Sequence, residues 1–423
     1  MRPLTVFAIF SAAVWAGDTD TFLLRNVDVY AVVNASIKDG AILVVDGKIA
    51  EIGSKIVPSK GLRIIDGKGL RAYPGMIDSG TELGLAEVSD VRATVDTAEL
   101  GVFMPQLRAL VAVNAESEHF PVARANGITS VLTFPSSNGN ARPGGERQII
   151  SGQAALIHMD GWTWEELAVN RSAALHLIFP SLPANQASGY AEAKRVYDRE
   201  LQQIDDFFDQ ARRYRIAKVG GAPGFKTDLK MEAMLPVLEG KLPVAISAAR
   251  EQAIRDAIQF AGRQQVRMVL LHPREWGKTA PELKARNIPV ILGPTLDLPL
   301  NEDDAYDSSF TLPAEAFRAG LKIAFGTFDN EFVRNLPYNA ATAVAYGLPY
   351  EEALKAVTIN AAEIWGVRDQ IGSIEKGKLA DLMLTTGDPL ETQTEVRMLF
   401  IKGKQVDLTN RHTRLYQKYL NRP

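Results

Sequence analysis

Residues 73–84 read YPGMIDSGTELG. A Pro-Gly turn is followed by an apolar pair, then by Asp78, Gly80 and Glu82. The pattern predicts a buried strand that ends in a polar loop. In a barrel of parallel strands such loops gather at the carboxyl ends and border the active site. We therefore expect the first barrel strand here, with functional residues at its end.

The segment after it alternates between short apolar runs and helical stretches. Residues 192–214 and 351–366 have helical periodicity. Strands that alternate with helices over residues 74–365 predict an α/β domain, a (β/α)8 TIM barrel, with a doubly wound sheet as the competing interpretation. The apolar runs that we assign to strands are 127–135, 242–247, 266–273, 288–294 and 321–327.

The two ends of the chain look alike. Residues 17–73 and 366–406 are both rich in short alternating segments, and Asp46-Gly47 is a dipeptide suited to a type I′ hairpin turn. These two pieces predict one small β-sandwich domain built from both chain ends. Residues 407–423 are locally basic and predict a solvated C-terminal tail.

Composition limits the functional classes. The 423 residues carry a formal net charge of -3 and no basic run that would follow a phosphate backbone, so we expect no nucleic-acid partner. The chain has no cysteine, which excludes thiol catalysis and thiolate zinc sites.

The first sixteen residues, MRPLTVFAIFSAAVWA, resemble a secretory signal peptide. Cleavage after Ala16 would give a secreted or periplasmic protein; an uncleaved anchor is the alternative. No later apolar run is long enough to cross a bilayer, so we expect no stable membrane span after cleavage.

Residues 73–84 resemble the P-G-x-I-D-x-H-x-H segment of the amidohydrolase superfamily, a group of metal-dependent hydrolases. GSIEKGKLADLML (372–384) resembles the closing β-segment of these enzymes, especially of the imidazolonepropionase-like group. The resemblance implies a barrel with a flanking β-domain. It also implies hydrolysis of carbon–nitrogen bonds, in non-peptide amides or in dipeptides, by hydroxide bound to a divalent metal, normally zinc.

Compared residue by residue, the chain lacks most of the ligands that this resemblance implies. The two histidines of the H-x-H motif correspond to Gly80 and Glu82, and a third family histidine corresponds to Ser247. His272 matches a strand-end histidine, and Asp329 lies near the catalytic aspartate. Glycine has no side-chain donor and serine is a poor zinc ligand. Gly80, Glu82 and Ser247 are therefore degenerate ligand positions.

Two functional hypotheses follow. The first is a pseudoenzyme that binds a small-molecule amide, a cyclic amide or a partner chain, as a homo- or hetero-oligomer. The alternative is a rebuilt hydrolase in which Glu82, His272 and Asp329 hold one divalent ion (Zn, Mn or Mg) or work without metal. Asp329 would be its base, and Arg334 would hold a substrate carboxylate. We interpret His158 and His176 as core histidines, His119 as a partly exposed structural histidine, and His412 as a solvated residue of the tail.

Overall fold

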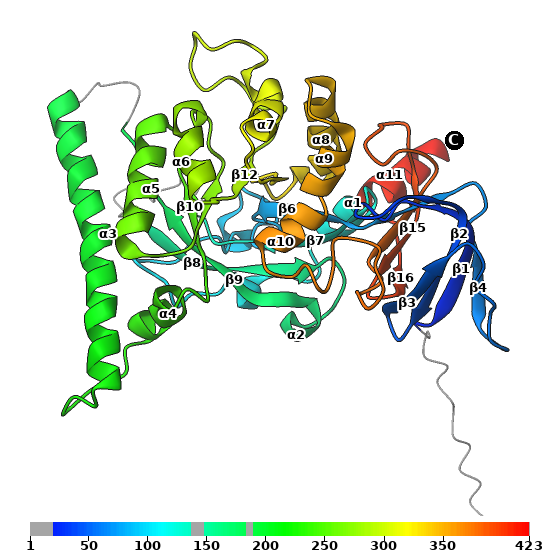
Figure 1. The fold of residues 1–423 in the computed structure, drawn as a ribbon, viewed down its shortest axis with the longest axis horizontal. Coiled ribbons are helices and arrows are strands. Elements are labelled where there is room, and N and C mark those ends of the chain that lie inside the picture. Colours follow the sequence, from blue (N-terminus) through cyan, green and yellow to red (C-terminus); the bar gives the residue numbers. More distant parts are fainter. Residues whose placement is uncertain (1–19, 137–147, 183–188, 423) are drawn as a thin grey trace, which may run out of the picture.

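A barrel of eight strands forms the centre of the molecule (Figure 1). The structure, a computed structural model, describes residues 20–136, 148–182 and 189–422; the expected signal peptide lies outside these residues. The strands follow the order β13-β12-β11-β10-β9-β8-β7-β6. Their bounds are β6 (Met76–Thr81), β7 (Ile128–Thr133), β8 (Ile150–His158), β9 (Ala168–Ile178), β10 (Val244–Ser247), β11 (Met268–Leu271), β12 (Val290–Leu292) and β13 (Ile323–Phe325).

The first and last strands of this order meet at a seam. The Phe328 amide donates to the Gly80 carbonyl at 2.8 Å, just after β13 and within β6. The predicted barrel is thus confirmed, and the doubly wound sheet is wrong. One departure from the regular (β/α)8 pattern is β8, which is antiparallel to both β7 and β9. Its first residues therefore lie at the carboxyl face, where the parallel strands end.

A second sheet joins the two ends of the chain, as predicted. Its order is β16-β15-β14-β5-β1-β2-β3, with β4 paired to β1. Asp46 and Gly47 join β2 to β3 with φ angles of 49° and 74°, as a type I′ turn requires. The strands are β1 (Phe22–Val29), β2 (Ile37–Val45), β3 (Lys48–Gly53), β4 (Arg63–Asp66), β5 (Arg71–Pro74), β14 (Leu382–Thr385), β15 (Val396–Ile401) and β16 (Lys404–Val406).

Helices surround the barrel. The longest, α3 (Tyr190–Val219), lies on the side away from the small sheet (Figure 1) and includes the stretch predicted at 192–214. The other α-helices are α1 (His119–Arg124), α2 (Trp164–Leu167), α4 (Leu229–Leu238), α5 (Glu251–Gln264), α6 (Ala280–Ala285), α7 (Ser308–Arg318), α8 (Leu336–Ala345), α9 (Tyr350–Ala356), α10 (Ile359–Ile364) and α11 (Arg411–Leu420). Short 3₁₀ helices are η1 (Arg92–Thr94), η2 (Ala109–Ala112), η3 (Gly277–Thr279) and η4 (Phe332–Asn335).

The single helix predicted at 351–366 is wrong, because the chain forms α9 and α10 there. The Val357 carbonyl between them accepts from the Ile77 amide of β6 at 2.8 Å. The Thr358 hydroxyl donates to the Leu354 carbonyl at 2.5 Å. The helix is interrupted so that this turn can bond to the barrel wall.

His158, interpreted as structural, joins the barrel to the small sheet. Its Nδ1 lies 3.5 Å from the Asp381 carboxylate, and both side chains are buried. Burial outweighs the attraction of Asp381 and lowers the pKa of His158. The pair connects the last residue of β8 to the small sheet.

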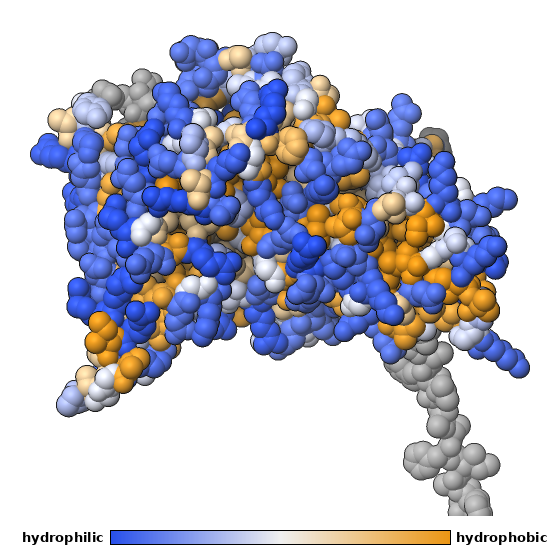
Figure 2. Space-filling view, viewed as in Figure 1, coloured by the Kyte–Doolittle hydropathy of each residue, from blue (hydrophilic) through white to orange (hydrophobic). Residues whose placement is uncertain are grey.

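The outer surface of α3 is mainly hydrophilic, but apolar side chains gather where α3 leads to α4 (Figure 2). The large exposed hydrophobic residues there are Ile216, Val219 and Leu229. Among the described residues, no helix combines the length and apolarity needed to cross a membrane.

Candidate functional site

Asp78 closes the barrel at the seam. Its Oδ1 accepts from the Gly80 amide at 2.9 Å and from the Thr327 amide at 3.2 Å. Its Oδ2 accepts from the Thr327 hydroxyl at 2.5 Å. Complete burial outweighs these bonds and raises the pKa of Asp78 to about 7. Asp78 thus joins the first and last barrel strands rather than facing open solvent.

The Phe328 ring covers the position of Gly80. A Cβ built on Gly80 would lie 3.1 Å from Cε1 of Phe328 and 3.3 Å from Cε1 of Phe134. Phe328 has a φ of 50°, a left-handed conformation that is rare for a bulky residue. Its ring packs edge-on against Phe134, with centroids 6.0 Å apart. Aromatic carbon therefore occupies the space into which a side chain at position 80 would extend.

Asp329, the predicted base, follows the seam, where its carbonyl accepts from the Thr81 hydroxyl of β6. Its Oδ1 accepts from the Glu331 amide at 2.6 Å and from the Phe332 amide at 2.8 Å, so the carboxylate holds the turn that leads into η4. Arg334 lies in the same short helix. Its guanidinium donates to the Glu331 carbonyl at 2.8 Å and lies 5.0 Å from the centre of the Phe332 ring. Both side chains are engaged in holding their own turn.

His272 follows β11, as predicted, with a φ of 48°. Its ring stacks on Phe328 at a centroid distance of 4.9 Å. Gly293 makes room for the ring, because a Cβ there would come within 2.3 Å of Nε2. Nε2 is buried, lies 4.0 Å from an Asp297 oxygen and has no hydrogen-bond partner among the described residues. Burial, followed by the charge of Arg274, lowers the pKa of His272 to about 4.

Across the barrel from the seam, Ser247 and His176 form a contact that we did not predict from the sequence. Ser247 is the last residue of β10, and its Oγ lies 2.8 Å from Nε2 of His176 on β9. His176 Nδ1 lies 2.7 Å from Ser151 Oγ and 2.8 Å from the Pro135 carbonyl oxygen. His176 was correctly interpreted as buried. Only the pairing of β9 with β10, Ala245 opposite His176, brings it to Ser247.

These residues do not fit the expected metal. Among residues 20–136, 148–182 and 189–422, no three histidine, aspartate or glutamate side chains lie where they could hold an ion. The predicted set of Glu82, His272 and Asp329 is thus not assembled, because the Asp329 carboxylate accepts from two backbone amides at the start of η4 while His272 stacks on Phe328. Glu82 is 8% exposed and remains at the end of β6. A catalytic site of this type usually needs three protein ligands.

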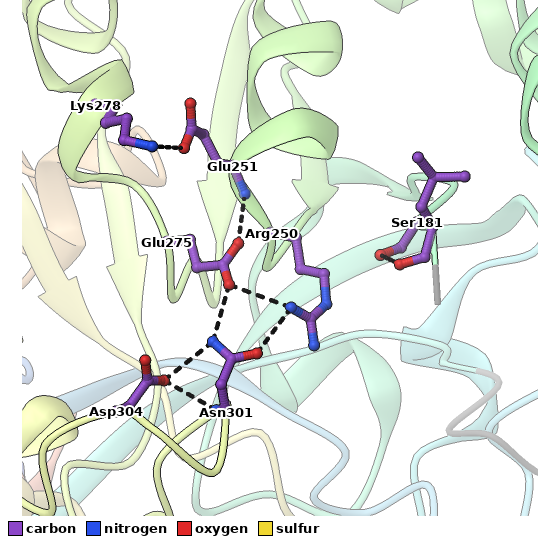
Figure 3. Close-up of polar contacts among 8 residues, drawn as sticks. Ser181, Arg250, Glu251, Glu275, Lys278, Asn301 and Asp304 are labelled. Carbon is purple, nitrogen blue, oxygen red and sulfur yellow. Dashed lines mark hydrogen bonds and ion pairs between the residues drawn. The ribbon is translucent and has the colours of Figure 1, made fainter. Parts of the chain in front are cut away.

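The loops after β10, β11 and β12 are joined by a polar network (Figure 3). Arg250 donates to Glu275 at 3.2 Å and to Asn301 at 3.0 Å. Asn301 donates to Glu275 at 3.1 Å and to Asp304 at 3.2 Å. Because these polar side chains are hydrogen-bonded to one another, the network holds the three loops together at the rim of the barrel. Ser181, on the loop after β9, lies apart from it (Figure 3).

Comparisons with known proteins agree on the fold. Over 91% of this chain and 99% of the other, the structure matches an amidohydrolase from Thermotoga maritima MSB8, with a TM-score of 0.79 and 29% identity. A prolidase in complex with N-methylphosphonate-L-proline matches with a TM-score of 0.55 and 17% identity, over 92% and 99% of the two chains. The second likeness shows the fold alone.

Among curated sequences, Amidohydrolase tasK of Hapsidospora irregularis is 23% identical over 86% of this chain. The chain spans 39% of that protein's length. The imidazolonepropionase of Symbiobacterium thermophilum is 24% identical over 83% of this chain and 84% of its own length. Residues 166–406 match the profile described as the Amidohydrolase family, and the chain therefore belongs to the amidohydrolase family, whose members typically use a divalent metal.

Proposed function

We propose that this chain is an amidohydrolase-family protein that has lost the metal-hydroxide reaction and binds a small amide or cyclic amide at the carboxyl ends of its barrel strands. One observation carries the proposal: Phe328 and Phe134 fill the space over Gly80, where the family places a metal ligand. Glycine leaves no donor at this position, and the two aromatic rings crowd the space that a side chain there would enter.

The surrounding residues support the same proposal. Asp329 already accepts two backbone hydrogen bonds in η4. The Ser247 hydroxyl is hydrogen-bonded to Nε2 of His176. Of the residues expected to hold an ion, His272 alone supplies an imidazole, and its ring stacks on Phe328. The described residues bring no three such side chains together, whereas a catalytic metal is normally held by three protein ligands.

Metal analysis of the purified full-length chain tests the loss of the metal reaction. We expect less than roughly 0.1 equivalent of zinc, manganese or magnesium per chain, before and after reconstitution. EDTA should leave the temperature of unfolding unchanged, because an ion bound only to the folded state would stabilise it. One tightly held equivalent whose removal lowers that temperature would refute the proposal.

Ligand binding is the second test. Hydantoins, lactams and N-acyl dipeptides should be screened by the shift in the temperature of unfolding, which rises when a ligand binds the folded state. We expect cyclic or simple amides to raise it, and the Ser247→Trp variant, which fills the barrel mouth, to abolish that shift. If this variant keeps the shift, the ligand binds elsewhere on the molecule.

Export and oligomeric state are further parts of the proposal. A signal peptide at residues 1–16 predicts that the protein recovered from an expressing bacterium begins at Gly17. Intact mass of the recovered protein tests this directly. We propose that the chain acts as a homo- or hetero-oligomer, and light scattering of the same sample tests whether it forms a homo-oligomer.

A further inference from the structure

Ser247, His176 and the Pro135 carbonyl share a geometry that the metal-based chemistry of the family does not use. The Pro135 carbonyl oxygen can only accept a hydrogen bond. Because it lies 2.8 Å from His176 Nδ1, that nitrogen carries the ring proton. Ser151 Oγ donates to the same carbonyl at 2.6 Å, which leaves its lone pairs free to accept from Nδ1 as well. The two partners of Nδ1 therefore select a single tautomer.

The other ring nitrogen, Nε2, therefore carries no proton. With Nδ1 protonated, Nε2 of His176 acts as an acceptor, and the Ser247 hydroxyl 2.8 Å away donates to it. Burial lowers the pKa of His176 to about 4, so the imidazole is neutral near pH 7. A hydroxyl that donates to a neutral imidazole, itself oriented through its second nitrogen, is the arrangement of an activated nucleophile.

Exposure agrees with this division of roles. Ser247 is partly exposed, whereas His176 is 1% exposed and Ser151 is fully buried. The Phe134 ring packs against His176 with centroids 4.6 Å apart, which excludes water from the base. A reactant can thus reach the hydroxyl while the imidazole stays dry.

The backbone around Ser247 is rigid. β10 is paired on both sides, and the Ser247 carbonyl accepts from the Phe179 amide at 3.0 Å. The turn that follows is held by the Ala249 carbonyl, which accepts from the Arg274 and Glu275 amides at 2.9 Å each. A reactive group carried by a paired strand is positioned more precisely than one on a loop.

We propose that Ser247 is a nucleophile and His176 its general base, giving this chain a metal-independent acyl-transfer site for esters or activated amides. The inference goes beyond the proposed function, which concerns the loss of the metal reaction and the binding of an amide but no catalysis. In the first step Ser247 Oγ bonds to the acyl carbon and its proton passes to His176 Nε2. The bond to the leaving group breaks, and the alcohol or amine departs with that proton. Water then attacks the acyl-serine and gives a proton to Nε2. The bond between the acyl carbon and Ser247 Oγ breaks, Nε2 returns that proton to Oγ, and the acid leaves.

A fluorophosphonate probe tests the nucleophile directly on the full-length chain. We expect one covalent adduct, located to Ser247 by peptide mass spectrometry, and no adduct in the Ser247→Ala variant. Ser181→Ala is the matched control, because it removes an exposed serine from a neighbouring loop of the same face. The control should label at the unchanged rate. Absence of an adduct, or an adduct that persists in Ser247→Ala, would overturn the inference.

The base is tested by His176→Gln, which should slow labelling by at least about 100-fold, as for loss of a general base. Circular dichroism of the variant reports whether it folds. If it does not fold, the chain's lack of cysteine offers a second route, since Ser247→Cys would carry the sole thiol. That thiol should react with iodoacetamide at least about ten times faster at pH 7 than the thiol of Ser181→Cys. Equal rates, or labelling unaffected by His176→Gln, would exclude His176 as the base.

Labelling with and without EDTA separates this inference from the proposed function. Labelling that survives EDTA supports the serine site. Activity that EDTA removes and zinc restores would refute the proposed loss of the metal reaction. A metal-free protein that takes no label would leave the proposed function standing and overturn only the Ser247–His176 inference.

Discussion

The seam between β6 and β13 and the pair of strands β9 and β10 lie across the barrel from one another, and they have opposite character. At the seam, Phe328 covers Gly80 and Asp78 is locked to Thr327. At β9 and β10, a partly exposed serine bonds to a buried histidine. One part of the carboxyl face is thus closed by an aromatic ring, whereas another part carries hydrogen-bonded polar side chains.

The largest expected effect concerns Asp78 and pH. Its folded pKa of about 7 lies above its ordinary value of 3.8, so between these values the folded protein holds a proton that the unfolded chain has lost. Stability should therefore fall as pH rises through this window. The wild type should lose roughly 3 kcal/mol relative to Asp78→Asn between about pH 5 and about pH 8. Urea unfolding of both proteins measures this, and parallel curves would show that Asp78 is not the buried acid described.

Phe328→Ala should lower the free energy of unfolding by about 2 kcal/mol, since it removes the stack on His272 and the edge contact with Phe134. Phe332, which is 47% exposed, supplies the control, and its alanine variant should cost well under about 1 kcal/mol. Gly80→Ala should destabilise the wild type but be tolerated in Phe328→Ala. Additive effects in this double-mutant cycle would mean that the ring does not fill the space over Gly80.

His176→Leu tests the other side of the barrel and should cost about 1–2 kcal/mol, because Ser151 and Ser247 each lose a hydrogen-bond partner. His272→Leu should cost less, because Nε2 of His272 has no partner to lose among the described residues. Thermal unfolding of the two variants gives the comparison. If His272→Leu loses more stability than His176→Leu, the polar contacts at β9 and β10 are not the stronger ones.

The smallest effect is expected for Asp329. Asp329→Ala should cost about 1 kcal/mol because the two amides at the start of η4 lose their acceptor, and Asp329→Asn much less, because the asparagine oxygen can also accept from them. Neither variant should change fluorophosphonate labelling. If Asp329→Asn abolishes labelling while stability is kept, Asp329 takes part in the chemistry and the seam is functional.

The architecture was predictable from the sequence, but the contacts at its mouth were not. The apolar runs and the two similar chain ends specify strands and a shared sheet, because burial imposes those patterns locally. His176 lies in an apolar run, ALHLI, that reads as core. Its partner Ser247 is 71 residues away, and periodicity carries no information about which strand lies beside it. Phe328 separates Thr327 from Asp329 in the sequence, yet only the left-handed backbone at that residue turns its ring over Gly80.

The reversed direction of β8 has a consequence for how the histidine can be tuned. Pro135 follows the end of β7 and Ser151 is the second residue of β8, so the two neighbours of His176 Nδ1 come from one antiparallel pair of strands. If β8 ran parallel to β7, its first residues would lie at the opposite end of the barrel and Ser151 would not reach Nδ1. The direction of one strand thus decides which atoms set the basicity of the histidine.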